Sequence, residues 1–361
     1  MKSNLYVFII CLFLYGCAQI SAPSGGEKDT NPPSIIHAEI LENSANRNKK
    51  IIVLKFDEYI QLNKLDEYFY VSPPVEKINI TIHEKDLSII VEDTLIQNCI
   101  YHFSLNLCVK DNNEGNILDS LNFQLHQNNI VDTFTLSGYL KEAYTLNIIN
   151  NAWVMLFSDT INDSLIFKET PLYIAKTDKN GRFHFPNLKD SEYKMAALTG
   201  VDFFYESGEK IGFSDENVCS RKDSFLSVFA FDPEYEINRE DSLTQADSII
   251  SNYNKDSTVK TNNTPLGTLE IISDAPPNCI FQLLQAEEVI QEAYFTERPY
   301  IIDSIATGKY YLKYIEDTNQ DSAWNTGSWE NKIQPERVVN YTSEIIIRSD
   351  WDLNLEWIIV E

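Results

Sequence analysis

The sequence predicts an all-β protein made of tandem β-sandwich domains that follow an N-terminal targeting segment. Three observations support this prediction. Tyr and Phe each number 19 against three Met, and Ile, Val and Thr are abundant, a composition typical of strands. Short apolar or alternating runs recur along most of the chain, separated by clusters of Asn, Asp, Gly and Pro. The first residues form an unbroken apolar run that stops just before a cysteine.

The targeting segment begins with Lys2 and the apolar run LYVFIICLFLY. The run is shorter than the roughly 18 residues that span a bilayer, and it suits a secretory signal. The next residues, LYGC, resemble the lipobox of bacterial lipoproteins, although Tyr15 is bulkier than the usual residue there. The resemblance implies that residues 1–16 are a removable signal peptide and that Cys17 becomes acylated. Several acyl chains, at about 0.8 kcal/mol per buried CH₂, form a stable anchor.

Two alternatives to lipidation remain open: an ordinary cleaved signal with an incidental cysteine, and an uncleaved anchor helix. Residues 17–32 lack apolar periodicity, contain Gly-Gly and end near Pro-Pro, so we expect a flexible tether. The expected location is the cell envelope, as an outer-membrane lipoprotein that faces the periplasm or the surface.

The chain is strongly acidic, with a formal net charge of −25. Such a surface repels phosphate backbones, and no basic cluster is interleaved with aromatics, so nucleic-acid binding is excluded. Wide contact with anionic headgroups is disfavoured too, which leaves the lipid as the membrane attachment.

The first predicted domain covers residues 33–128. Seven short strand-like runs in roughly 100 residues indicate an Ig-like sandwich. The runs PPSIIHAEI, KIIVLKFDEYIQL, VSPP and DNNEGN resemble the SbsA-type bacterial Ig-like domain of envelope lipoproteins. The strand-like runs are HAEIL, KIIVLKF, YFYVSP, INITIH, LSIIVE, CIYHFSLNLCV and LNFQLH.

The second predicted domain covers residues 133–232. Its TDKNGRF stretch predicts a hairpin, with Asn180-Gly181 as the turn pair. The run TDKNGRFHFPNL and the strand after it resemble carboxypeptidase-regulatory-like or transthyretin-like β-sandwich domains, with Ser191 in place of the usual Gly before Tyr193. Those modules carry no catalytic residues, so the resemblance implies a spacer or presentation module.

A polar linker is expected at residues 233–264, followed by a C-terminal β-sandwich at 265–361. The last domain echoes the second: Ile305 aligns with Leu188 and Tyr310 with Tyr193, and an acidic, aromatic loop follows each matched strand. We therefore expect a diverged repeat. We also expect three separable domains, with weak contacts across the linker. The resemblance to envelope lipoproteins, a family of unestablished biochemical role, spans nearly the whole mature chain.

Cysteines and catalytic motifs give little sign of chemistry. Cys99 and Cys108 lie in one apparent strand, about 30 Å apart at strand rise, so with Cys219 and Cys279 they are expected to be free, buried thiols. No nucleophile elbow, HExxH, Walker or GxGxxG motif is present, and we predict no enzyme activity.

Two candidate sites lie in the loop after residue 316. Asp317, Asn319 and Asp321 have the alternate oxygen spacing of a calcium loop. The stretch also resembles the D-x-N-x-x-x-x-W-D-T-G loop of the same lipoproteins. The alternative is a turn in which these side chains bond their own backbone amides. Trp324 and Trp329 are candidates for a ligand platform, and the alternative is that they are structural wedges.

The sequence thus favours a non-enzymatic, lipid-anchored envelope protein with an adhesion, scaffold or presentation role. Its partners would be the membrane through Cys17 and an envelope protein or glycan. The alternative function is a receptor that binds carbohydrate or peptide through the C-terminal aromatic and acidic loops.

Overall fold

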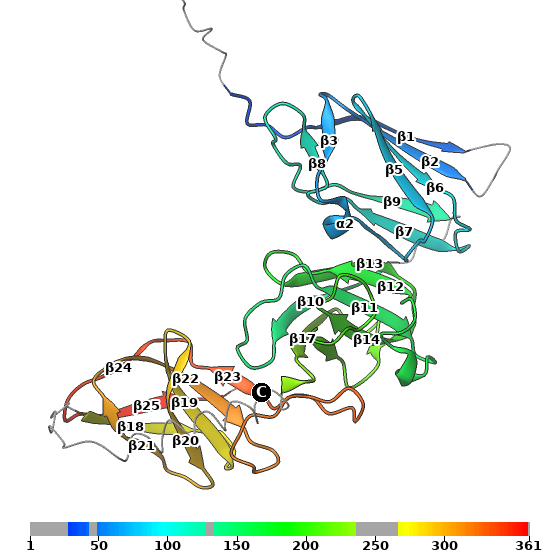
Figure 1. The fold of residues 1–361 in the computed structure, drawn as a ribbon. Coiled ribbons are helices and arrows are strands. Elements are labelled where there is room, and N and C mark those ends of the chain that lie inside the picture. The colour runs from blue at the N-terminus through cyan, green and yellow to red at the C-terminus, as the bar shows by residue number, and fades with distance from the viewer. Residues whose placement is uncertain (1–27, 43–48, 128–132, 236–265, 360–361) are drawn as a thin grey trace, which may run out of the picture.

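The computed structural model describes residues 28–42, 49–127, 133–235 and 266–359, and these residues form an all-β protein. Three groups of strands follow one another along the molecule, with the second group between the other two (Figure 1). We call them the first, second and third domains. The signal peptide, Cys17 and most of the tether and linker lie outside the described residues. No helix in the described segments is long and apolar enough to cross a membrane.

The first domain packs a four-stranded sheet, in the order β1-β2-β6-β5, against a three-stranded sheet, β4-β7-β9. Strand alternation creates the core: in β2, Ile52, Leu54 and Phe56 point inward and are buried. The elements are β1 (Ile35–Glu42), β2 (Lys50–Phe56), β3 (Ile60–Leu62), α2 (Leu65–Tyr68), β4 (Tyr70–Ser72), β5 (Ile78–His83), β6 (Asp86–Val91), β7 (Cys99–Ser104), β8 (Val109–Asp111) and β9 (Asn122–Gln127).

One strand prediction in this domain is wrong. CIYHFSLNLCV is not a single strand, because the chain turns after β7 and continues as β8, which pairs with β3 instead of β9. Leu107 has φ 62°, and the amide of Cys108 donates to the carbonyl of Leu105. A left-handed residue ends a strand whatever its apolar pattern. The four described cysteines are thiols that form no disulfide with one another, and all but the half-buried Cys219 are buried.

The second domain is one eight-stranded sheet folded on itself, in the order β12-β11-β14-β15-β17-β10-β13, with β16 paired to β14. The predicted Asn180-Gly181 turn is present, and the Asp178 carboxylate accepts the amides of Asn180 and Arg182. The hairpin prediction is wrong, however, because β12 pairs with β11 while β13 pairs with β10. The strands are β10 (Phe134–Glu142), β11 (Trp153–Ser158), β12 (Tyr173–Lys176), β13 (Arg182–Leu188), β14 (Glu192–Leu198), β15 (Ile211–Phe213), β16 (Val218–Cys219) and β17 (Phe225–Phe231), with a 3₁₀ turn at Asp163–Leu165.

The third domain consists of a three-stranded sheet, β21-β18-β25, and a five-stranded sheet, β20-β19-β22-β23 with β24 paired to β22. The terminal run IIIRSDWDLNLEW is split between the two sheets as β24 and β25. The strands are β18 (Leu266–Ser273), β19 (Cys279–Gln285), β20 (Glu288–Phe295), β21 (Tyr300–Ala306), β22 (Gly308–Glu316), β23 (Val338–Asn340), β24 (Ile345–Ile347) and β25 (Asp352–Trp357).

Strand pairing confirms the predicted repeat. β10 pairs antiparallel with β13 and parallel with β17, and β18 pairs in the same way with β21 and β25. The antiparallel pairs carry an irregularity at a similar place, just before Leu188, the last residue of β13, and Ile305, the last but one of β21. The matched tyrosines also make the same bond: Tyr193 Oη donates to the carbonyl of Lys189 at 3.0 Å, and Tyr310 Oη to that of Ala306 at 2.9 Å.

Candidate functional site

The second and third domains share one apolar core. A single buried cluster contains Phe157 and Phe231 from the second domain together with Ile280, Ile315 and Trp324 from the third. The prediction of separable domains is therefore wrong at this junction. The reason lies in β11 and β19, whose side chains are buried on both faces of the strand. A strand whose outer face is also apolar needs a second cover, and each domain supplies it to the other.

A buried lysine fixes this junction. Lys313 of β22 is only 4 % exposed, and its Nζ donates to the carbonyl of Tyr144, in the second domain, at 2.9 Å. The same amino group lies 3.8 Å from the centroid of the Tyr144 ring, in cation–π geometry. Tyr144 Oη in turn donates to Oε1 of Gln282 at 3.0 Å. Burial lowers the pKa of Lys313 to about 8, although Glu142 acts in the opposite direction.

Both candidate tryptophans pack into this junction. Trp324 is 5 % exposed, its indole N–H donates to the carbonyl of Glu336 at 3.0 Å, and its ring centroid lies 5.0 Å from that of Tyr144. Trp329 contacts Phe167 and Phe213 of the second domain edge to face, at 5.2 and 5.1 Å. Trp324 is therefore too buried to be a ligand platform. The packing of both rings corresponds to the wedge alternative.

The side-chain oxygens of the candidate calcium loop accept hydrogen bonds from backbone amides of the same loop. The Asp317 carboxylate, in a residue only 2 % exposed, accepts the amides of Asp321 at 3.2 Å and Ser322 at 2.9 Å. Asn319 Oδ1 also accepts the Asp321 amide, at 3.1 Å. The Asp321 carboxylate accepts from the amide of Ala323 at 2.8 Å. These oxygens point at the backbone of the loop itself, as the turn alternative requires.

Glu336 also binds this loop through hydrogen bonds, and its sequence context does not predict this role. Its carboxylate accepts the amide and hydroxyl of Thr318, at 2.7 and 2.9 Å, and the amide of Asn325 at 3.0 Å. Burial raises the pKa of Glu336 even though these bonds oppose the shift. A lone Glu among 54 acidic residues gives no sequence signal of this role.

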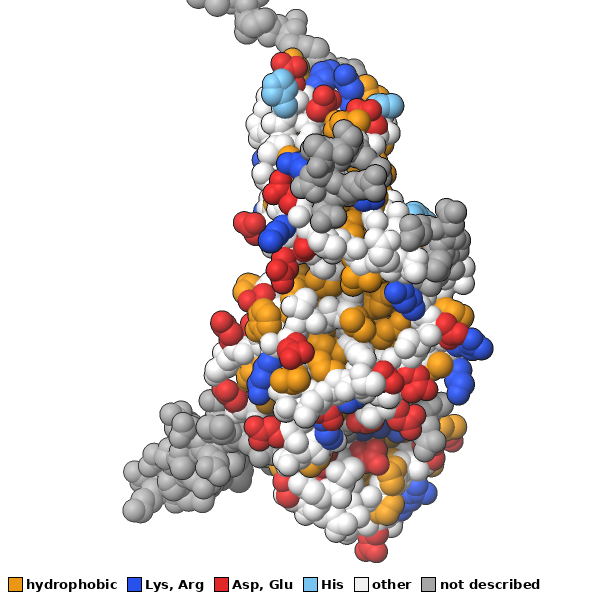
Figure 2. Space-filling model, turned by 90° about the vertical axis from the view of Figure 1, so that its right-hand side faces the viewer, with side chains coloured by type: hydrophobic (Ala, Val, Ile, Leu, Met, Phe, Trp, Pro, Cys, Tyr) orange, Lys and Arg blue, Asp and Glu red, His pale blue; other side chains and the backbone are white. Residues whose placement is uncertain are grey.

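A groove of about 1050 Å³ runs beside the junction and is lined by both domains. Burial lowers the pKa of its Lys332 to about 8, with Asp163 3.8 Å away acting in the opposite direction. Apolar side chains gather around the middle of the molecule in Figure 2, whereas charged side chains are scattered over the rest of that face. The groove lining includes Phe167, Tyr205, Glu234, Trp329, Lys332 and Gln334.

The contact between the first and second domains is more polar. Ser72 Oγ accepts the amide of Ile174 at 3.0 Å, and Gln124 Nε2 donates to Asn187 Oδ1 at 2.6 Å. The amino group of Lys176 donates to the carbonyl of Glu67 across the same junction. Hydrogen bonds and one edge-to-face contact, between Tyr70 and Trp153 at 5.9 Å, hold this junction, whereas a larger shared apolar core holds the other.

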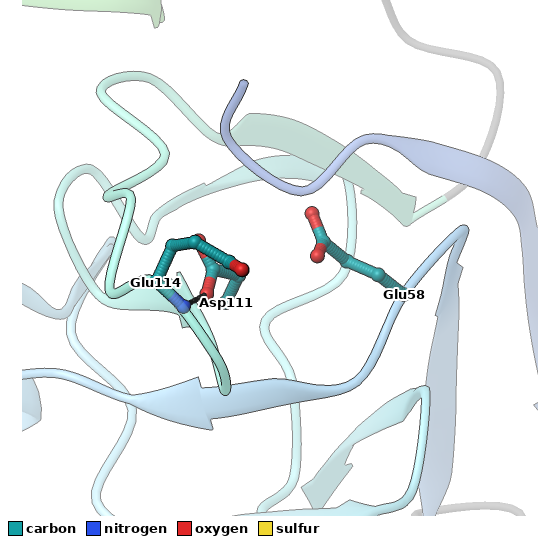
Figure 3. Close-up of side chains that lie close together, drawn as sticks. All are labelled: Glu58, Asp111 and Glu114. Carbon is teal, nitrogen blue, oxygen red and sulfur yellow. Dashed lines mark hydrogen bonds between the residues drawn. The ribbon is translucent and has the colours of Figure 1, made fainter. Parts of the chain in front are cut away.

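One acidic group in the first domain has metal-like spacing. Ligand atoms of Glu58, Asp111 and Glu114 lie within 4.8 Å of one another, and Figure 3 shows Glu58 pointing at the other two from a different segment. The Asp111 carboxylate already accepts hydrogen bonds from the four backbone amides of residues 113–116, so it stabilises its own loop. Burial opposes the shift, but these bonds lower the pKa of Asp111. Burial, followed by the charge of Asp111, raises the pKa of Glu58.

Fold and junction together define the class: a chain of β-sandwich domains, two of which share an apolar core. Residues 29–125 match the family of bacterial Ig-like domains, which agrees with the Ig-like domain predicted at 33–128. No curated protein sequence gives a significant match.

Solved structures overlap the chain only distantly. The group B streptococcus pilus 2b backbone protein is 9% identical with a TM-score of 0.18, and the overlap covers 54% of this chain and 97% of that one. The Bacillus anthracis TIE protein is 12% identical with a TM-score of 0.19, over 93% of this chain and 59% of that one. The BcpA major pilin subunit of Bacillus cereus is 9% identical with a TM-score of 0.19, over 55% and 70%. Overlaps of this quality carry no information on activity or partners.

Proposed function

We propose that this protein is a non-enzymatic scaffold or adhesion arm of the bacterial cell envelope, anchored by lipid at Cys17. The observation that carries the proposal is the apolar core shared by the second and third domains. Flexibly strung binding modules do not need such a core, whereas an arm that holds a distance or an orientation does. Hydrogen bonds at the other junction extend the stiff unit to the Ig-like domain.

The scaffold proposal is tested by a distance measurement between the second and third domains. Spin labels at Lys179→Cys and Glu288→Cys, in a Cys219→Ser background, should give one narrow distance distribution, because the shared core fixes the two domains. Trp324→Ala should broaden this distribution, and Tyr311→Ala, on an exposed side chain, should not. A broad distribution in the parent protein would show independent domains and refute the stiff arm.

The anchor is supported by the LYGC sequence and by the acidic surface, which leaves a lipid as the favourable attachment. Cys17→Ser should leave the protein soluble or unprocessed. Recovery of this variant in the membrane fraction, at the parent amount and with its signal removed, would contradict lipidation. This outcome is independent of the distance measurement.

A second candidate function is supported by the groove at the junction, which combines aromatic, acidic and amide side chains in about 1050 Å³. Sites for extended carbohydrates and peptides have this mixture of apolar walls and a few polar groups. In this role the arm would be a receptor. Binding to a glycan or peptide array should be lost in Tyr205→Ala with Glu234→Gln and kept in Tyr311→Ala; equal binding by both variants would exclude the groove.

A further inference from the structure

Strand β1 is an exposed edge of the four-stranded sheet in the first domain. Within the described residues β1 pairs only with β2, and it ends the strand order of its sheet. Residues 35–41 of the strand are all exposed, and three large aliphatic side chains stand out: Ile36 at 59%, Ile40 at 51% and Leu41 at 45%. In Figure 1 the strand lies on the side of the first domain that faces away from the second. An exposed edge of this kind is a template for another strand.

The opposite edge of the same sheet, β5, is built differently. Its half-buried Ile78, Ile80 and Ile82 alternate with exposed polar residues, Asn79, Thr81 and His83. β1 has a register irregularity near Ile36 and carries Glu39, but these two features leave its aliphatic side chains exposed. Only one of the two edges is therefore apolar enough to gain from a partner strand.

We propose that β1 pairs antiparallel with β1 of a second copy of this chain, so that the two four-stranded sheets become one. A two-fold axis perpendicular to the sheet keeps each face of the sheet on its own side. Directly opposite residues must then share a face, so the axis passes through one residue of β1, which lies opposite its own copy, and not between two residues. An axis at His37 would place the two His37 side chains opposite each other, and an axis at Glu39 would oppose two carboxylates.

An axis at Ala38 removes both conflicts. His37 then lies opposite Glu39 of the other copy, and the exposed Ile40 of each copy approaches the exposed segment around Ile36 of the other. Within one chain His37 Nε2 is already 4.0 Å from the Glu39 carboxylate, so a paired strand brings two such pairs together. This self-complementarity identifies a second copy as the partner. Each copy carries a net charge of −25, so association should strengthen with added salt, which screens the repulsion.

Disulfide formation in the purified full chain tests both the partner and the register. In a Cys219→Ser background, Ala38→Cys should oxidise to a covalent dimer, because residues directly opposite have Cβ atoms about 4.5–5.5 Å apart. Glu39→Cys is the register control, since its diagonal separation of about 7–8 Å is beyond disulfide reach. Thr81→Cys, exposed on β5, reports random collisions.

We expect at least tenfold faster dimer formation by Ala38→Cys than by either control, and a loss of that advantage when Ile40→Lys is added. Ile40 is half exposed in the single chain, so an unchanged melting temperature will show that Ile40→Lys leaves the fold intact. Equal rates for Ala38→Cys and Thr81→Cys would overturn the proposal. Faster oxidation of Glu39→Cys would overturn the register, and indifference to Ile40→Lys would exclude the apolar edge.

Discussion

Replacing Lys313 by methionine should change how stability depends on pH. Burial lowers the pKa of Lys313 from 10.5 to about 8. Between these values the unfolded chain keeps a proton that the folded chain has lost, so the free energy of unfolding rises with pH. At 1.36 kcal/mol per pKa unit, the rise is about 3 kcal/mol between pH 8 and pH 10.5. Below pH 8 the charged form carries the full penalty. Lys313→Met keeps the side-chain volume and removes this titration.

Calorimetry of the full chain at pH 7 to 10.5 measures the effect. For a cooperative unit of 150–250 residues, about 3 kcal/mol corresponds to a shift of roughly 6–12 °C in melting temperature. The melting temperature of Lys313→Met minus that of the parent should therefore fall by this amount across the range. Burial also raises the pKa of Tyr314, but this tyrosine is present in both proteins, so its effect cancels in the difference between their melting temperatures. Parallel pH profiles would show that burial does not lower the pKa of Lys313, and would refute this reasoning.

Three further outcomes are expected. Gly327→Ala should lower the free energy of unfolding by about 1–3 kcal/mol, because the added Cβ would lie 2.6 Å from the ring of Phe231 across the junction; an unchanged calorimetric transition would mean that the domains do not meet there. Millimolar calcium should leave the melting temperature unchanged, whereas Asp317→Ala should lower it, because that carboxylate caps two loop amides; a calcium-dependent rise lost in Asp317→Ala would restore the metal site. Burial raises the pKa of Cys108 and Cys279 to about 12, so at pH 8 a thiol reagent should modify them only after urea unfolding; fast labelling of the native protein would contradict their burial.

The strands of the Ig-like domain could be predicted because its pattern is local. KIIVLKF and INITIH give β2 and β5 with the predicted bounds, since alternation and flanking turns specify each of them. The apparent strand from Cys99 to Cys108 failed because a left-handed residue, Leu107, breaks it, and no glycine marks the position. Local patterns do not show which neighbour a strand chooses, so the turn at Asn180-Gly181 was found and its strand pairing was not.

The junction was missed for a different reason. The run WVMLFS of β11 is buried on both faces, and this was visible as an apolar stretch without alternation. Such a stretch indicates a doubly covered strand but does not say what covers it. The sequence offers Trp324 and Trp329 as a ligand platform or as structural wedges, and their packing supports the wedge alternative. Glu336 and Lys313 depend on partners from distant segments, so only the folded chain shows their roles.

The parallel pairing of β10 with β17, and of β18 with β25, determines how this chain would bear tension. Parallel neighbours run from the same end of a domain, so the chain enters the second domain near Asn187, beside the first domain, and leaves at Asp232, beside the third. A pull on the two ends acts along the strands, and the hydrogen bonds between residues 137–142 and 225–230 are loaded together in shear. They cannot be opened one after another, as they are when a hairpin is unzipped from its end. β18 and β25 of the third domain pair in the same parallel way, so the hydrogen bonds between residues 268–273 and 352–357 would also be loaded in shear if that domain were pulled at its two ends.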